Sequence, residues 1–315
     1  MQPIMNKLLF TFLIFLSCNV YNLNAQDETT QTIAAAKTIA DTSSIIAEGA
    51  QLQLISNQFS FTEGPTVDKK GNIFFTDQPN DKIWKYGTDG KLSVFLDKTG
   101  RSNGLYFYKR KLLACADEKN EVWSISRNKK ITVLLTNYKG QKLNGPNDLW
   151  VSPNGGIYLT DPYYQRSYWT RKKPEIAGQK VYYLPKRKKD LVIADENIKQ
   201  PNGIVGTADG KYLYVADIGD SKTYRYVIQP DGTLKDRQLF TEQGSDGMTL
   251  DNHGNVYLTG NGVTVYSPEG KKIAHIAVPA KWTGNVCFGG KEKNKLFITA
   301  SEAVYILDMK VKGVE

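Results

Sequence analysis

A motif that occurs six times constrains the fold of this chain more than any other feature. Each copy opens with one oxygen-bearing side chain, continues as a short strand, turns, and ends in a second strand at Thr or Ala. The opening residues, called lead residues below, are Glu63, Asn103, Asn147, Asn202, Asp246 and Asn285. The second strands end at Thr76, Ala116, Thr160, Ala216, Thr259 and Thr299. Both series advance in steps of 39 to 56 residues and stay in phase, which indicates a true internal repeat.

The period and the strand composition predict an all-β fold, a six-bladed β-propeller. Repeats of roughly 40–50 residues built from short strands are typical of propeller blades. The first repeat predicts strands over residues 66–68, 72–76, 82–86 and 92–96. The sixth repeat lacks a fourth strand, while a strand-like run, residues 52–55, precedes the first repeat. We therefore expect this N-terminal run to complete the last blade and close the ring, because closure removes exposed strand edges.

The N-terminal segment predicts an exported protein. Lys7 precedes an apolar run over residues 8–16, and Ala25 ends a short polar stretch, so residues 1–25 are predicted to be a secretory signal peptide. Cys18 offers an alternative, a lipid anchor. The apolar run is too short for a permanent membrane span. We expect a periplasmic or secreted protein, with no transmembrane segment.

The rest of the chain predicts a leader and one domain. Residues 26–49 are rich in Thr, Ala, Ser and Asp and are predicted to be a leader or linker, and residues 50–315 to form the propeller. The net charge is +9, with basic runs at residues 171–173 and 186–189. These runs lie at predicted strand ends and accompany no nucleic-acid motif, so they indicate a solvated basic face and no nucleic-acid partner.

Propeller geometry brings the lead residues together. The innermost strand of each blade lines the central channel, so residues at its start converge on one mouth of that channel. The second strand returns to the same face, which places Asp161 there as well. The connection after it, residues 161–179, is long and aromatic and includes Tyr163. Such inserts are often functional, so we expect either a wall over a pocket or a loop packed on a neighbouring blade.

The chemistry of the converging residues predicts a divalent cation. Glu63 and Asp246 are carboxylates that would repel each other in a narrow channel, and a cation removes that cost. Oxygen-only ligands suit Ca²⁺ or Mg²⁺, or else Mn²⁺. The two histidines, His253 and His275, are not lead residues. The alternative is that the lead residues are turn formers, each capping its own backbone.

Several short motifs resemble the regucalcin/gluconolactonase family, also called the SMP-30/gluconolactonase/LRE-like group. The motifs are Glu63-Gly64-Pro65, Pro146-Asn147-Asp148-Leu149, Thr160-Asp161-Pro162, Pro201-Asn202-Gly203 and Asp246-Gly247-Met248. Residues 285–290 followed by residues 296–299 are similar to the bacterial sugar-lactonase branch of that family. The resemblance covers about residues 52–308.

The resemblance implies a propeller with one catalytic divalent cation in its channel, Ca²⁺ first, with Mg²⁺, Mn²⁺ or Zn²⁺ as alternatives. The implied ligands are Glu63, Asn147, Asn202 and Asp246, and Asp246 is also the implied general base. We expect substrate contacts from Asn103, Asn285, Asp161 and Tyr163. One position departs from the pattern. Animal members carry an Arg that helps hold the sugar two residues before the third-motif Asn, and this chain has Gly145 there.

The resulting hypothesis is a metal-dependent, gluconolactonase-like hydrolase that opens a small sugar lactone. A serine-nucleophile route lacks support because no Gly-x-Ser-x-Gly elbow occurs. Two alternatives remain open. One is a hydrolase that uses the same site on other lactones or on phosphoesters. The other is an exported propeller that binds a carbohydrate or a protein and performs no chemistry.

Overall fold

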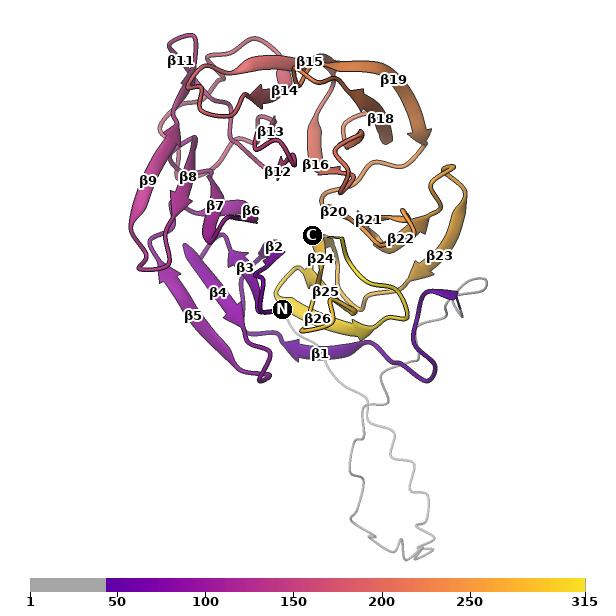
Figure 1. Ribbon diagram of the computed structural model, residues 1–315. Helices are drawn as coiled ribbons and strands as arrows, with labels where there is room; N and C mark the ends of the chain where they lie inside the picture. The colour runs from indigo at the N-terminus through magenta and orange to yellow at the C-terminus, as the bar shows by residue number, and fades with distance from the viewer. Residues whose placement is uncertain (1–43, 315) are drawn as a thin grey trace, which may run out of the picture. The chain divides into compact units, whose positions relative to one another are not determined.

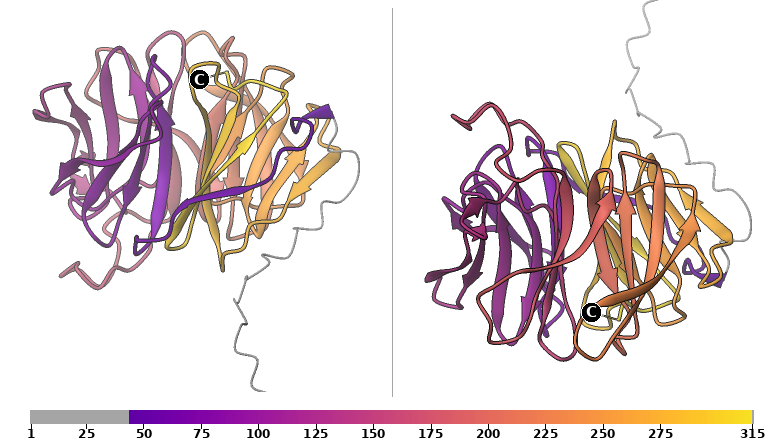
Figure 2. Two further views of the ribbon diagram at one scale, coloured as in Figure 1. Left: turned by 90° about the horizontal axis from the view of Figure 1, so that it is seen from below. Right: turned by 90° about the horizontal axis from the view of Figure 1, so that it is seen from above.

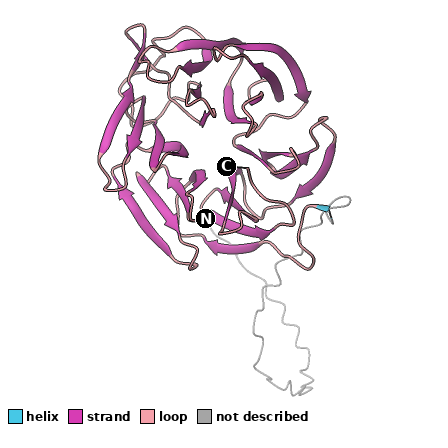
Figure 3. Ribbon diagram, viewed as in Figure 1, coloured by secondary structure: helices cyan, strands magenta, loops and turns pink. Residues whose placement is uncertain are grey.

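Six four-stranded antiparallel sheets form a ring in the computed structural model, which describes residues 44–314 (Figure 1). Strands make up most of the ring, and loops join them at both faces (Figure 3). The predicted six-bladed β-propeller is therefore confirmed. A small extra sheet pairs β10 (Asn137–Tyr138) with β11 (Gln141–Lys142) between the second and third blades.

The first three blades run in chain order from the innermost strand outward. Blade 1 contains β2 (Thr62–Val67), β3 (Ile73–Asp77), β4 (Lys82–Tyr86) and β5 (Leu92–Asp97). Blade 2 contains β6 (Ser102–Tyr108), β7 (Lys111–Ala116), β8 (Glu121–Ile125) and β9 (Ile131–Leu135). Blade 3 contains β12 (Leu149–Val151), β13 (Ile157–Asp161), β14 (Gln179–Leu184) and β15 (Val192–Ile198).

The last three blades follow the same order, except that the sixth takes its outer strand from the N-terminal side of the chain. Blade 4 contains β16 (Pro201–Gly206), β17 (Tyr212–Asp217), β18 (Lys222–Ile228) and β19 (Leu234–Thr241). Blade 5 contains β20 (Met248–Leu250), β21 (Val256–Gly260), β22 (Gly262–Tyr266) and β23 (Lys272–Ile276). Blade 6 contains β24 (Thr283–Gly289), β25 (Lys295–Ala300), β26 (Ala303–Asp308) and β1 (Gln53–Ser56).

Strand β1 closes the ring as predicted. It pairs antiparallel with β26, with Gln53 opposite Ile306 and Leu54 opposite Tyr305. Figure 2 shows this indigo strand lying against the yellow C-terminal blade. The chain therefore runs from the last blade into the first through residues 57–61, and the edge of β26 is covered.

The packed domain begins earlier than the sequence indicated. Residues 44–49 were predicted to belong to a leader, yet Ile45 is buried and Ile46 forms an isolated bridge with Met309. The backbone N–H of Lys310 donates to the carbonyl of Ile45. This segment and the C-terminal tail therefore cover each other. The predicted signal peptide and Cys18 lie outside the described residues, and within residues 44–314 no helix has the length and apolarity to cross a membrane.

Neighbouring blades pack through strands that are apolar on both faces. Every residue of β3 is buried, and Phe75 on that strand lies 5.4 Å, centroid to centroid, from Phe297 of blade 6. Ile73 and Cys287 belong to the same cluster. A blade held between two neighbours has no solvated face, which explains why the inner strands lack polar alternation.

In blades 1, 3 and 5, the Thr that ends the second strand links its blade to the next one. The hydroxyl of Thr76 donates to the carbonyl of Asn103 at 3.1 Å, and that of Thr160 donates to the carbonyl of Asn202 at 2.7 Å. Thr259 donates in the same way to Gly284 at 2.8 Å. The second sequence marker therefore has a structural cause, because each bond fixes the position of the following blade's lead segment.

Glycine after a lead residue allows the inner strands to approach closely. A Cβ on Gly64 would lie 2.2 Å from the backbone oxygen of Asn103, and a Cβ on Gly247 would lie 1.9 Å from the side chain of Asn285. No other residue type fits at these two positions without moving the next blade. The ring is consequently tight at the mouth where the lead residues sit.

Candidate active site

The lead residues of the first five blades line one cavity of about 430 Å³ at this mouth. Its wall consists of Phe61, Glu63, Gln78, Pro79, Asn103, Asn147, Tyr164, Arg166, Asn202, Ile218, Asp246 and Trp282. In β2, β6, β16 and β24 the strand pairing shifts at or beside the lead residue. Such bulges turn a side chain out of the ladder, which explains how residues at strand starts reach the channel.

Glu63 and Asp246 form the electrostatic centre of the cavity. Glu63 is buried, and its pKa is raised well above the usual range, first by burial and then by the negative charge of Asp246. Burial also raises the pKa of Asp246 to about 6, against hydrogen bonds that include one from Trp282 and lower it. Two carboxyl groups that resist ionisation in one cavity provide a place where a cation is favoured.

Asn202 presents an unused acceptor beside these carboxyls. Its Nδ2 donates to the hydroxyl of Tyr164 at 3.0 Å, while its Oδ1 is buried and has no hydrogen-bond partner. Leaving a buried amide oxygen unpaired costs about 1–3 kcal/mol, so such an atom calls for a ligand. An amide oxygen is a good ligand for a hard cation.

The other predicted lead residues differ in their placement. Asn103 and Asn147 are buried and line the cavity. Asn285 does not line it, because its Oδ1 accepts the backbone N–H of Val286 at 2.8 Å and its side chain lies against Gly247. Asn285 hydrogen-bonds to Glu63 and lowers the pKa of that carboxyl. The structure thus places Asn285 behind Glu63 and away from the space open to a substrate.

Asp161 was predicted to contact substrate, and the structure does not support that prediction. Asp161 is fully buried, and its two carboxylate oxygens accept the backbone N–H groups of Asn144 at 2.9 Å and of Gly145 at 2.8 Å. Asp217 holds the entry to its own blade in the same way. In blades 3 and 4, the acid at the end of the second strand therefore anchors the backbone that leads into the blade.

The loop between β13 and β14, residues 162–178, contributes to the wall through residues other than the predicted Tyr163. The Tyr163 hydroxyl donates to Gln165, and its ring lies 5.8 Å from that of Trp169, outside the cavity. Tyr164 and Arg166 line the cavity instead. The loop was expected either to form a wall of the pocket or to pack on a neighbouring blade, and it does both. Trp169 is buried and donates to the carbonyl of Asp117 in the neighbouring blade.

Sequence reasoning missed Trp282 entirely. It precedes β24, its side chain is 37% exposed, and its Nε1–H donates to Oδ2 of Asp246 at 2.5 Å. A Trp three residues before the lead residue of the sixth repeat was visible in the sequence, but no other repeat carries one. The site residues were predicted from positions that recur in every repeat, so a residue that occurs in one repeat alone could not be found in this way.

The donor set suits an oxygen-ligated cation and excludes softer sites. Among the described residues, no cluster of three or more His, Cys, Asp and Glu side chains lies close enough to hold a metal. The cavity instead offers two carboxyls and amide oxygens, including the unpartnered Oδ1 of Asn202. These groups fit Ca²⁺ or Mg²⁺ better than ions that prefer nitrogen or sulfur.

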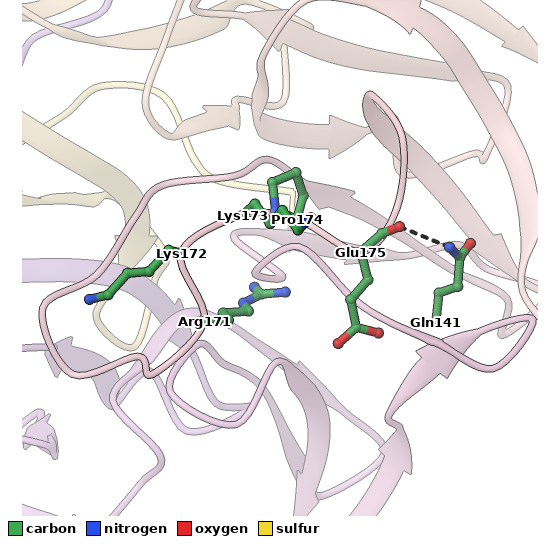
Figure 4. A pocket seen from close by; sticks show the side chains of 6 residues that line it. All are labelled: Gln141, Arg171, Lys172, Lys173, Pro174 and Glu175. Atoms are coloured by element: carbon green, nitrogen blue, oxygen red, sulfur yellow. Dashed lines mark hydrogen bonds between the residues drawn. The ribbon is translucent and has the colours of Figure 1, made fainter.

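A second, open depression lies on the same inserted loop (Figure 4). It is lined by Gln141, Arg171, Lys172, Lys173, Pro174 and Glu175. The Nε2 of Gln141 donates to the carbonyl of Glu175 at 2.8 Å, which fastens the base of the loop to β11. None of the lead residues borders this depression, so it does not extend the candidate site.

Comparison with known proteins agrees with the fold. A family model described as the SMP-30/Gluconolactonase/LRE-like region matches residues 61–302. A gluconolactonase from Zymomonas mobilis is 28% identical over 304 residues, covering 85% of this chain and 84% of the relative. A solved gluconolactonase from Xanthomonas campestris superposes with a TM-score of 0.80 at 26% identity, covering 87% of this chain and 94% of that one.

A calcium-binding regucalcin from Agrobacterium tumefaciens shares the fold, with a TM-score of 0.69 at 19% identity over 83% of this chain and 94% of its own. The match runs from the residue before β2 to the residue before β26 and includes all six lead residues. This chain therefore belongs to the SMP-30/gluconolactonase/LRE-like family.

Proposed function

We propose that this chain is a lactone hydrolase that opens a sugar lactone with the help of a divalent cation. The observation that carries the proposal is the buried, unpartnered Oδ1 of Asn202 beside the carboxyls of Glu63 and Asp246 in one open cavity. The gluconolactonases of similar sequence and structure support the reaction class.

The proposed cation ligands are Glu63, Asn147, Asn202 and Asp246. Two carboxylates balance the charge of a divalent ion. Burial raises the pKa of both acids, and the negative charge of Asp246 raises that of Glu63 further, so a cation would stabilise their ionised forms. Ca²⁺ is the first ion to test, because all these ligands are oxygens. When bound, a divalent ion supplies polarisation of the lactone carbonyl and stabilises charge on its oxygen.

The chain's own residues supply the proton transfer and the orientation. Asp246, whose pKa burial raises to about 6, is the proposed base that takes a proton from the attacking water. The indole N–H of Trp282 binds one oxygen of this carboxylate at 2.5 Å and fixes its direction. Asn103 lines the cavity and offers an amide to the substrate. Ring opening then yields a hydroxy acid.

A binding propeller without chemistry is less well supported. A scaffold gains nothing from keeping two acids with raised pKa values and an unpaired amide oxygen in an open cavity, because each lowers the stability of the fold. Opening of other lactones and cleavage of phosphoesters would use the same groups, so a substrate panel has to separate them.

The test is a pH-stat assay on a panel of lactones and phosphoesters, with EDTA and with Ca²⁺, Mg²⁺, Mn²⁺ or Zn²⁺ added back. We expect acid release from glucono-1,5-lactone that EDTA abolishes and one of these ions restores. Calorimetry on the chelated protein should show one bound ion per chain. Hydrolysis that continues undiminished in EDTA would refute the metal-dependent mechanism, and faster turnover of phosphoesters would refute the substrate class.

A further inference from the structure

Asp117 holds the inserted loop of blade 3 against blade 2. Its Oδ2 accepts the Nε–H of Arg166 at 3.2 Å and also the hydroxyl of Tyr168. Its backbone carbonyl accepts the indole N–H of Trp169 at 3.1 Å. Three side chains of the loop thus converge on one buried acid. A loop fixed in this way presents its remaining side chains in defined positions.

Gly145 provides the space that this arrangement needs. A Cβ at this position would lie 3.0 Å from Cη2 of Trp169 and 3.0 Å from Oδ1 of Asp117. Any longer side chain would displace the indole and with it the loop. The loop can therefore lie over residue 145 because this residue has no side chain.

Arg166 brings the only Lys or Arg side chain to the described cavity wall. Only its Nε pairs with Asp117, and no described residue accepts a hydrogen bond from either Nη. The guanidinium carbon lies 5.3 Å from the centre of the Tyr164 ring, which itself borders the cavity, and the side chain is 25% exposed. Four N–H donors of Arg166 consequently remain for a ligand.

The charges around the cavity favour a neutral partner for these donors. The charge of Arg166 is matched by Asp117, and those of Glu63 and Asp246 would be matched by a divalent ion. Asp148 adds a further negative charge that acts on Glu63. An anionic substituent on the substrate would therefore add a negative charge with no positive partner in the cavity. A hydroxyl oxygen can accept a hydrogen bond from the guanidinium and adds no charge.

We propose that Arg166 is the specificity-determining residue of the site, binding ring hydroxyls of a neutral, polyhydroxylated lactone through its two Nη groups, with Asp117 as its positioning residue. This inference rests on the proposed hydrolysis of a sugar lactone and names the residue that recognises the hydroxyls of that substrate. A lactone without hydroxyls would contact the site only through its ester group and would make no hydrogen bond to Arg166.

The test compares glucono-1,5-lactone with δ-valerolactone, which has the same ring size and no hydroxyls, in the metal-loaded full chain. Arg166→Ala should lower kcat/KM for the hydroxylated lactone roughly 10- to 100-fold, mainly through KM, and leave δ-valerolactone within about twofold. Arg166→Lys should fall between wild type and Arg166→Ala, since Lys keeps the charge and loses the fork. Lys172→Ala is the matched control, because it removes an exposed cation of the same loop outside the cavity wall (Figure 4).

Three outcomes overturn the inference. Equal losses on both lactones in Arg166→Ala would show a structural role and leave the proposed function standing. A wild-type preference for glucaro-1,4-lactone, which carries a carboxylate, that disappears in Arg166→Ala would assign Arg166 to an anionic substituent. A wild-type enzyme that opens neither lactone would remove the proposed function and this inference together. Asp117→Asn should raise KM for the hydroxylated lactone selectively, as expected of a residue that acts through Arg166.

Discussion

The channel lining and the inserted loop form the cavity in different ways. The channel residues recur once per blade, and the strand pairing and inter-blade hydrogen bonds that hold them, such as that from Thr160 to Asn202, recur as well. The loop, residues 162–178, occurs in one blade, and its side chains are held by Asp117 alone among the acids that end the second strands. Under the two proposals above, the repeated channel residues carry out the reaction and the single inserted loop selects the substrate.

The same contrast appears between two acids at equivalent positions. Asp161 in blade 3 binds the backbone that enters its own blade. In blade 2 this task falls to Asp81, whose Oδ1 accepts the N–H groups of Thr99 at 2.8 Å and Arg101 at 2.7 Å. Asp117 is thereby released to hold Arg166. The acid at this repeat position therefore holds the backbone in blade 3 and the inserted loop in blade 2.

The largest effect is expected from a substitution among the channel residues. Asp246→Asn removes the proposed base and one proposed cation ligand and should lower kcat roughly 10²- to 10⁴-fold on every lactone, hydroxylated or not. The free energy of unfolding of the chelated protein should not fall, because the change removes one of two repelling acids. Initial rates measure the first effect and urea denaturation the second. A loss of activity confined to hydroxylated lactones would contradict the prediction, because Asp246 would then bind substrate hydroxyls and not act as the base.

A second prediction concerns a hydrogen bond between the loop and a channel residue. Tyr164→Phe removes the hydroxyl that accepts from Nδ2 of Asn202, so the amide loses its fixed orientation. Ca²⁺ affinity should fall roughly 10- to 100-fold, as is typical when the partner of a ligand is lost. Calorimetry on the chelated protein measures it, with Tyr163→Phe, whose hydroxyl faces Gln165, as the control. Unchanged affinity would confine the loop to substrate selection.

The sequence predicted the features that recur in every repeat, and it did not predict the contacts of the inserted loop. Six blades, closure by β1 and the convergence of Glu63 and Asp246 all follow from a period and from the antiparallel return of the second strand. Which acid holds the inserted loop did not follow, because Asp117 and Asp161 look alike in sequence and differ in what surrounds them. The orientation of a loop side chain depends on contacts with a distant blade, which no local pattern encodes.

A third prediction separates backbone anchors from loop anchors. Asp161→Asn leaves one buried backbone N–H without an acceptor and should lower the free energy of unfolding by about 1–3 kcal/mol, with KM little changed in the folded enzyme. Asp217→Asn is the matched control and should behave alike, because Asp217 accepts two N–H groups at 2.8 Å. If Asp161→Asn instead altered lactone preference as Asp117→Asn should, the two acids would not differ in role.

The smallest expected effect tests whether the loop depends on Gly145. Gly145→Ala would place a methyl group 3.0 Å from Cη2 of Trp169, which overpacks the contact and should cost about 1 kcal/mol of stability while raising KM for glucono-1,5-lactone a few-fold. Trp169→Phe removes the atom in conflict, so the double variant should lose less than the two single variants combined. Urea denaturation and steady-state kinetics on all four proteins measure this coupling. Strict additivity would mean that the indole does not occupy the space over residue 145, and the link between this glycine and the placement of Arg166 would then fail.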